Sequence, residues 1–257
     1  MGDAARRIDV LDTAPRFTVA DAEALNARFA GVATRDMLAA VLAEGLAGRI
    51  AAVSSFGAES AVLLHLIASV DPAVPVLFLE TGKHFPETLA YRDEVVLRLG
   101  LTGVRNLTPD ADAIAKKDET GLRWSYDPDG CCEIRKVIPL ENALAGFDAQ
   151  ITGRKAFQSS TRAALPRFEI EAGRIKFNPL ADWDKARIEA YFAEHDLPRH
   201  PLEAQGYLSI GCAPCTSIVK PGEDPRAGRW RGWDKVECGI HTAVTPLDDD
   251  GANDPAF

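Results

Sequence analysis

The sequence predicts an α/β fold, with a mostly parallel sheet covered by helices on both faces and an irregular C-terminal segment. Short apolar stretches of strand length alternate with longer stretches of helical periodicity over much of the chain, and this alternation is typical of parallel sheets. Of the 257 residues, 46% are hydrophobic and 26% are charged. This composition is ordinary for a soluble globular protein and excludes a mostly disordered chain.

The expected elements follow one another in a regular order. Residues 1–45 are Ala-rich and are expected to be helical. We expect strands at residues 50–53, 74–79, 104–107 and 149–152, and helices at residues 61–70, 87–99, 132–145 and 184–195. Residues 168–171 and 174–177 flank Ala172-Gly173 and are expected to pair as a hairpin. From about residue 198, Pro and Gly become frequent, which indicates irregular structure.

The charge balance limits the partners. Lys and Arg number 29 and Asp and Glu 38, for a formal net charge of −9. Such a chain as a whole is not attracted to nucleic acid or to an anionic membrane surface, although a local basic cleft could bind an anion. The apolar runs are too short to span a bilayer, and no apolar stretch follows the basic residues near the N-terminus. We therefore expect a cytoplasmic protein.

A turn rich in small residues links the strand at residues 50–53 to the next helix. Its hydroxyls, on Ser54, Ser55 and Ser60, stand where a helix begins, and free N–H groups and the helix dipole suit a phosphate there. Gly57 allows close approach of a ligand to the backbone. Such a turn is also common for geometric reasons alone, and it lacks the Gly-Lys-Ser/Thr ending of the common phosphate loop.

The five cysteines fall into two close pairs and one single residue. Cys131 and Cys132 are adjacent, and Cys212 and Cys215 form a C-x-x-C motif. Four thiolates suit either zinc or an iron–sulfur cluster. Adjacent residues on a helix diverge by about 100°, so neighbouring thiolates favour a multi-iron cluster over a single ion. Buried apolar thiols are the alternative for the adjacent pair.

Cations accompany these thiols. Arg135 and Lys136 follow the adjacent cysteines at i,i+4 spacing, which would place positive charge beside the thiolates if Cys132 opens a helix. Cys238 stands alone, with His241 three residues away, and a nearby His or cation can turn a thiol into a nucleophile. A lone cysteine is nevertheless more often an inert buried residue.

Two basic stretches could clamp an anion. Arg226 and Arg229 lie upstream of Cys238, and residues 152–162 carry Arg154, Lys155 and Arg162 directly after a predicted strand, where α/β sheets place their ligand loops. Bidentate Arg or a Lys point charge would suit phosphate or sulfate. An ordinary solvated loop is the alternative for residues 152–162.

Together these motifs resemble the assimilatory adenylyl-sulfate (APS) reductases, within the broader phosphoadenylyl-sulfate (PAPS) reductase family. Where that family commonly reads Leu-Asp-Thr-Gly, this chain has Glu80 in place of the Asp, a change that conserves charge. The resemblance rests on the motifs at residues 54–60, 79–88, 131–136, 152–154, 211–216 and 237–241.

The resemblance implies a fold of the adenine-nucleotide alpha hydrolase type (PP-loop, Rossmann-like). It implies an N-terminal helical segment at residues 1–45, a nucleotide-binding α/β domain at 46–200 and a cluster-binding, catalytic segment at 201–257. It also implies a thioredoxin-dependent reduction of APS to sulfite and AMP in sulfate assimilation and cysteine biosynthesis, through an S-sulfocysteine intermediate. The reductant would be thioredoxin or glutaredoxin, and a homo-oligomer is left open.

On positions that match the family's motifs, the resemblance implies a role for each candidate residue. The catalytic residues would be Cys238, His241 and Lys136. One [4Fe-4S] cluster would be held by Cys131, Cys132, Cys212 and Cys215. The substrate would be bound by Ser54, Ser55, Phe56, Gly57, Ser60, Leu79, Thr81, Gly82, Gly153, Arg154, Arg162, Arg226 and Arg229.

Three other functions stay open at this point. Family members that use the 3′-phosphorylated substrate usually lack the cysteine pairs, so the pairs favour APS, but a PAPS reductase is an alternative. A tRNA thiolation enzyme of the same fold would need a Ser-Gly-Gly-x-Asp-Ser loop and a basic surface, which this acidic chain does not show. A redox sensor with Cys238 as its regulatory thiol is the non-enzymatic alternative.

Overall fold

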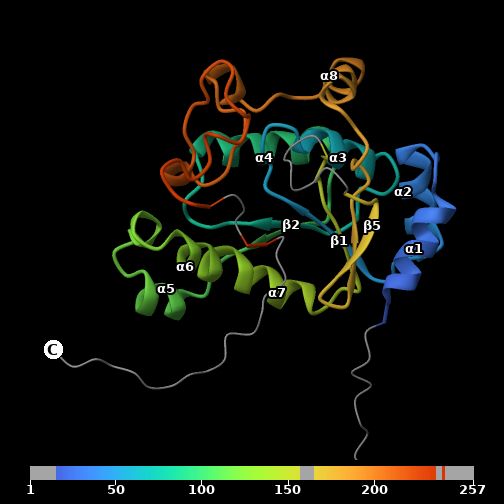
Figure 1. Cartoon of the computed structure of the whole chain (residues 1–257), viewed down its shortest axis with the longest axis horizontal. Coiled ribbons are helices and arrows are strands. Elements are labelled where there is room, and N and C mark those ends of the chain that lie inside the picture. Colours follow the sequence, from blue (N-terminus) through green and yellow to red (C-terminus); the bar gives the residue numbers. More distant parts are fainter. Residues whose placement is uncertain (1–15, 157–164, 236–238, 241–257) are drawn as a thin grey trace, which may run out of the picture.

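A six-stranded sheet runs through the centre of the protein (Figure 1). The computed structural model describes residues 16–156, 165–235 and 239–240. The strand order is β3-β2-β1-β4-β6-β5, and all neighbours are parallel except β5 and β6. The strands are β1 (Ile50–Ser54), β2 (Val76–Leu79), β3 (Val104–Leu107), β4 (Ala149–Ile151), β5 (Phe168–Glu171) and β6 (Arg174–Phe177). The predicted fold class is confirmed.

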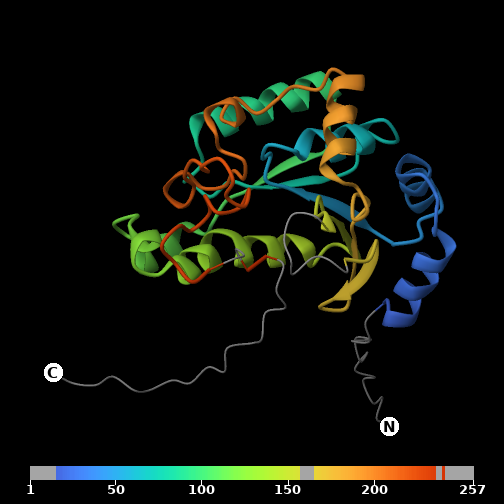
Figure 2. The same cartoon turned by 45° about the horizontal axis from the view of Figure 1, so that its top comes forward.

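Helices cover both faces of this sheet (Figures 1 and 2). Helices α3 and α4 lie on one face with α8 packed against α3, and α5, α6 and α7 lie on the other. In the described ranges, no helix is long and apolar enough to cross a membrane. The helices are α1 (Val19–Arg28), α2 (Thr34–Ala43), α3 (Ser60–Ala68), α4 (Pro86–Leu99), α5 (Ala111–Lys117), α6 (Pro128–Cys132), α7 (Ile138–Leu144) and α8 (Lys185–Glu194), with short turns η1 (Arg123–Ser125), η5 (Glu203–Gln205) and η6 (Ala213–Cys215) and the π-helical η2 (Glu133–Val137).

Apolar side chains on both sides of the sheet explain why the central strands form. All four residues of β2 are buried, as expected for a parallel strand that has both faces covered. The larger core joins Phe78 of the sheet to Leu64 of α3 and to Leu25 of α1. A smaller core packs Leu77 against Leu140 of α7 on the opposite face. The N-terminal helices therefore share the main core of the sheet.

The hairpin and the predicted central strands are found within about two residues of their expected positions. Ala172 and Gly173 both have positive φ angles, of 48° and 74°, and two such residues suit the twist of a tight hairpin. Helix α5 was not expected, because its seven residues bury no side chain and leave no apolar periodicity in the sequence. Residues 1–15 of the expected N-terminal helical segment lie outside the described ranges.

The helix expected at residues 132–145 differs from the prediction. It begins earlier, at Pro128, where the Asp127 side chain caps it, and it passes through the π-helical η2 before continuing as α7. Pro139 explains this break, because it has no N–H for the carbonyl of Arg135 and its ring would crowd that carbonyl in a regular helix. Cys132 therefore ends α6 instead of opening a helix. The expected cations nevertheless lie beside the thiols, because Arg135 and Lys136 line the same small cavity as the four cysteines.

The chain beyond α8 is irregular, as predicted, and is anchored on α4. The Tyr91 hydroxyl donates to the carbonyl oxygen of Pro198 at 2.9 Å, and the Thr88 hydroxyl lies 3.0 Å from Nε2 of His200. Burial lowers the pKa of His200 to about 4, so this imidazole is neutral at pH 7. These contacts hold the C-terminal segment against the sheet's helical layer.

Gly103 offers a test of the close packing between β2 and β3. A Cβ atom at this position would lie 2.5 Å from the backbone oxygen of Val74 and 2.6 Å from that of Ala73. We expect Gly103→Ala to lower the free energy of unfolding by about 1–3 kcal/mol, since backbone atoms must move. Urea denaturation measures this change.

Gly146→Ala is the matched control. A Cβ atom there would meet nothing closer than the Ala143 carbonyl oxygen, at 3.8 Å. Its free energy of unfolding should stay within about 0.5 kcal/mol of the unsubstituted protein. Equal losses in the two variants would contradict the packing argument.

Candidate functional site

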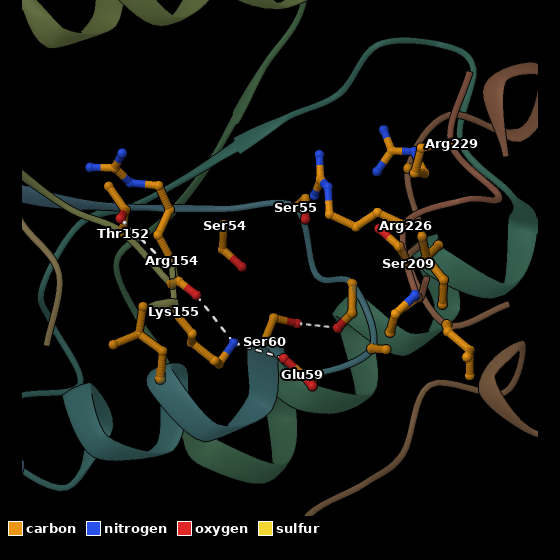
Figure 3. A pocket seen from close by; sticks show the side chains of 18 of the residues that line it. Ser54, Ser55, Glu59, Ser60, Thr152, Arg154, Lys155, Ser209, Arg226 and Arg229 are labelled. Carbon is orange, nitrogen blue, oxygen red and sulfur yellow. Dashed lines mark hydrogen bonds and ion pairs between the residues drawn. The ribbon is translucent and has the colours of Figure 1, made fainter. Parts of the chain in front are cut away.

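A cavity of about 280 Å³ opens where the parallel strands end. Ser54 ends β1, Leu79 ends β2, and Thr152 and Gly153 follow β4, and all four residues line the cavity. Ligands of open α/β sheets bind at this edge, because the connections that follow the strands diverge there. The C-terminal segment closes the opposite side with Arg226 and other residues (Figure 3).

The loop between β1 and α3 supplies the small and hydroxyl-bearing residues. Ser54, Ser55, Gly57 and Ser60 all line the cavity, and the Ser60 hydroxyl donates to the Gly57 carbonyl oxygen at 2.6 Å. The structure therefore brings these four predicted residues together around the N-terminal end of a nine-residue helix.

Phe56, in the same loop, holds the loop from below. Its side chain is fully buried and packs edge-on against Phe78, with ring centroids 5.5 Å apart. It does not line the cavity. Its φ angle is +47°, a conformation that costs energy for a residue with a side chain and persists where packing enforces it. Phe56 thus shapes the loop through the core.

The segment after β4 carries two cations with different partners. The Arg154 guanidinium pairs with Glu169 and lies 3.3 Å from the Asn178 side-chain oxygen, and Figure 3 shows it directed away from Ser60. Lys155 is buried, and its ammonium lies 2.9 Å from a carboxylate oxygen of Glu59. Arg154 lines the cavity, but its charge is engaged on the side of the β5–β6 hairpin.

A second, smaller cavity gathers the paired cysteines. Cys131, Cys132, Cys212 and Cys215 all line it, although the two pairs lie far apart in the sequence. Three of these thiols are buried and Cys215 is half-buried. Within the part of the chain that the structure describes, no three His, Cys, Asp or Glu side chains have the spacing for one metal ion. The residues that gather here are nevertheless the predicted four.

The surroundings shift the pKa values of these thiols in opposite directions. Burial raises the pKa of Cys131 and that of Cys215, each with a contribution from neighbouring thiols. Burial alone would also raise the pKa of Cys212, but the charge of Lys136 and the hydrogen bond with Thr81, at 3.3 Å, bring it below its ordinary value. Of these three thiols, Cys212 is thus the one that its surroundings favour as a thiolate.

Lys136 links the two cavities. It lines both of them, and only 9% of its surface is exposed. Its charge acts on Cys212 and Cys215 on one side and on His84 on the other. A cation in this position can stabilise an anionic ligand and the thiolates at the same time.

A buried ion pair supports the thiol group from behind. The Arg135 guanidinium donates to a carboxylate oxygen of Asp118 at 2.5 and 3.1 Å, and to the Thr81 carbonyl oxygen at 2.8 Å. Burial alone would raise the pKa of Asp118, but hydrogen bonds from the Arg123 backbone and from Arg135 outweigh it, so its pKa lies below 3.8. Thr81 and Gly82 therefore belong to the thiol side and do not line the larger cavity.

Only part of the terminal motif is described. Gly239 approaches Val137 of η2, since a Cβ atom on it would lie 3.2 Å from the valine side chain. Ile240 lines the larger cavity and packs on the smaller core, and Lys235 pairs with Asp129 at the start of α6. Cys238 and His241, and also Arg162, lie outside the described residues.

Several cavity residues were missing from the sequence-based set. Arg226 and Arg229 were predicted and do line the cavity, but His84, Lys185, Glu189, Glu203 and Ser209 line it as well. The two glutamates come from α8 and from the irregular segment, where no motif marks them. His84 lies two residues after Gly82, within the motif at residues 79–88, and could have been found from that position.

Comparisons with known proteins agree with this geometry. A family model described as "Phosphoadenosine phosphosulfate reductase domain" matches residues 49–218. An adenosine 5′-phosphosulfate reductase of Mesorhizobium japonicum is 49% identical over 236 residues, which cover 92% of this chain and 93% of that protein. A phosphoadenosine 5′-phosphosulfate reductase of Gloeobacter violaceus is 43% identical, over 79% of this chain and 87% of that protein.

A solved structure shows the same fold. The phosphoadenylyl-sulfate (PAPS) reductase from Candida auris, as a phosphate complex, superposes with a TM-score of 0.68 at 28% sequence identity. The match covers 80% of this chain and all of that chain.

The buried pair beneath the thiols makes a prediction about stability. Asp118→Asn should lower the free energy of unfolding at pH 7 by about 3–5 kcal/mol, because Arg135 would stay buried without its counter-ion. Since the folded-state pKa of Asp118 is depressed, its stabilisation is complete above about pH 3.8 and is lost as the pH falls further. Chemical denaturation at pH 7 and below pH 4 measures both effects.

Asp196→Asn provides the comparison for this pair. Asp196 also pairs with a cation, Arg98, but their side chains are 96% and 43% exposed. Its loss should cost less than about 1 kcal/mol at pH 7. If Asp118→Asn cost no more than Asp196→Asn, the buried pair would not stabilise the thiol group as described.

Proposed function

The chain belongs to the phosphoadenosine phosphosulfate reductase family, and we propose that it reduces adenosine 5′-phosphosulfate (APS) to sulfite and AMP in sulfate assimilation. It is an oxidoreductase that acts on a sulfur group, as its relatives at 40–53% identity are named. The observation that carries this proposal is the position of three cations, Lys136, Arg226 and Arg229. They line a cavity at the carboxyl edge of the sheet, next to the segment that follows Cys238.

The cations Lys136, Arg226 and Arg229, which line the cavity, suit the negative charge that APS carries when it binds. APS carries its negative charge on a phosphate and a sulfate joined as a mixed anhydride, and Arg and Lys bind such groups by charge-assisted hydrogen bonds. The loop with Ser54 and Ser60 adds hydroxyls and the N-terminal end of α3 to the same cavity. Two anions, a thiolate and a phosphosulfate, can then approach each other with less repulsion.

Cys238 is the proposed nucleophile. Its thiolate attacks the sulfur of the sulfate group, a sulfur–sulfur bond forms, and the bond from that sulfur to the bridging oxygen breaks. AMP leaves with the electron pair, and Cys238 becomes an S-sulfocysteine. Ile240 lines the cavity two residues further on, which supports delivery of this thiol to the substrate. His241 is proposed to act beside the thiolate and the sulfo group.

A dithiol reductant completes the reaction. We propose thioredoxin or glutaredoxin, whose thiolate attacks the Cys238 sulfur by thiol exchange. Sulfite leaves with the electron pair of the sulfur–sulfur bond, and a disulfide joins the reductant to Cys238. The second thiol of the reductant then releases the enzyme thiolate and forms the reductant's own disulfide. The reductant thus supplies both electrons.

We propose that the four paired cysteines hold a [4Fe-4S] cluster. Four thiols meeting in one small cavity, with Arg135 and Lys136 beside them, support this proposal. Such a cluster would be held by four thiolates, and the chain brings four cysteines to this cavity. When bound, the cluster would tie the two cysteine-bearing segments together and set the charge beside Lys136.

The nucleophile is tested with APS in the absence of reductant. The protein should gain the mass of one sulfo group and release AMP, and Cys238→Ser should bind APS without gaining that mass, since an alcohol at neutral pH is a poor nucleophile. Intact-mass spectrometry and AMP release measure this. With thioredoxin added, sulfite should appear in an amount equal to the AMP. A sulfo adduct on Cys238→Ser would contradict the assignment.

The cluster is tested by iron and sulfide analysis of protein purified without oxygen. Cys212→Ser should lose most of the iron, because one of four thiolates is removed. Cys238→Ser is the matched control and should keep it, since Cys238 is not one of the paired cysteines. Zinc in place of iron, or equal iron in both variants, would overturn the cluster assignment.

A further inference from the structure

Ionisable residues of both signs line the larger cavity. Figure 3 shows Arg226 and Arg229 on one side and Glu59 with Ser60 on another. Lys136 lies between this cavity and the thiols, because it lines both cavities. With the phosphosulfate on these cations, as proposed above, the nucleoside of the substrate extends toward the carboxylates.

Three carboxylates, Glu59, Glu189 and Glu203, line another part of the cavity, together with Lys155 and Lys185. Glu189 and Glu203 both pair with Arg199, and the charge of Glu59 acts on Glu203. Glu59 pairs with Lys155 at 2.9 Å. Arg199 lies 2.5 Å from one carboxylate oxygen of Glu189. Glu59 and Glu189 thus each pair with a cation, and Glu203 shares Arg199 with Glu189.

Glu203 differs from the other two. Its Oε1 lies 3.2 Å from Arg199, but its Oε2 is buried and has no hydrogen-bond partner among the described residues. The side chain is 27% exposed and lines the cavity. A buried carboxylate oxygen without a donor is costly, and native structures normally provide one from the protein, from water or from a ligand.

The backbone around Glu203 is well fixed. It begins η5 directly after Leu202, which is buried against Ala58 and Ile210 in a small apolar cluster. Arg199, its ion-pair partner, is stacked over the Phe192 ring at 3.9 Å. The position of the carboxylate is therefore set by packing on both sides, and a ligand must adapt to it.

The two candidate substrates differ in what they would present to this carboxylate. The ribose of APS has free 2′- and 3′-hydroxyl groups, which can donate hydrogen bonds. The 3′-phosphate of PAPS offers acceptor oxygens and nearly two negative charges at neutral pH. A carboxylate oxygen that lacks a donor can accept a hydrogen bond from the hydroxyl groups of APS, and its charge repels the 3′-phosphate of PAPS.

We propose that Glu203 is a specificity-determining residue, which makes the cavity selective for a nucleotide with a free 3′-hydroxyl group. This inference rests on the proposed function, because it takes APS and PAPS to bind in the larger cavity. The relatives at 49% and 43% identity are named as an APS reductase and a PAPS reductase, respectively. Of these two substrates, APS is the one with a free 3′-hydroxyl group. A 3′-phosphate would need a cation beside it, whereas Glu203 places a carboxylate there.

The test compares kcat/KM for APS and for PAPS in the cluster-containing protein with thioredoxin as reductant. The unsubstituted protein should prefer APS. Glu203→Gln removes the negative charge, and we expect the preference for APS over PAPS to fall by about tenfold or more, which is the scale of a hydrogen bond to a charged group. Glu194→Gln is the matched control, because Glu194 is 71% exposed on α8 and does not line the cavity. Its preference should not change.

A binding measurement keeps the test independent of turnover. Titration calorimetry with AMP and with adenosine 3′,5′-bisphosphate should show tighter binding of AMP, and this difference should shrink in Glu203→Gln. Glu203→Asp keeps the charge but withdraws it by one methylene, so it should fall between the two even if the Gln variant folds poorly. Unchanged discrimination in both variants, or a preference of the unsubstituted protein for PAPS, would overturn the proposal. Turnover of neither sulfonucleotide would instead contradict the proposed function.

Discussion

The junction between the turn after β2 and the C-x-x-C turn is the constraint on which both cavities depend. Ala213 donates its backbone N–H to the Lys83 carbonyl oxygen at 2.7 Å, His84 and Cys212 form an isolated antiparallel bridge, and the Thr81 hydroxyl lies 3.3 Å from the Cys212 sulfur. This junction brings one cysteine pair to the other. Because the same C-terminal segment continues to Arg226 and Arg229, it also completes the lining of the larger cavity.

The electrostatics of the site are local and are not those of the whole chain. The protein carries a formal charge of −9, yet Lys136, Arg226 and Arg229 meet in one cavity. Near them, Arg135 pairs with Asp118 and Lys155 with Glu59. Buried pairs of this kind hold elements in register and leave little net charge. Cations can therefore gather at one cavity while the chain as a whole carries a negative charge.

The cysteine group and the loop between β1 and α3 were predictable because residue type and spacing in the sequence indicate their chemistry. Ser54 and Ser60 line the expected cavity, and the two cysteine pairs meet. The orientation of side chains was not predictable in the same way. Phe56 and Thr81 sit inside motifs, yet one packs into the core and the other contacts a thiol. Motif membership says that a position matters and leaves open whether it acts through the ligand or through packing.

By itself, the sequence determined the order of strands and helices, the hairpin around Ala172 and the residue types available for chemistry, because apolar periodicity and turn residues act over short stretches of chain. Only the tertiary structure decided that Glu203 and Glu189 line the larger cavity, that the helix containing Pro139 is π-helical beside the thiols, and that Lys136 lies between the two cavities. These features depend on contacts between segments far apart in the chain, and such contacts leave no local pattern from which they can be read.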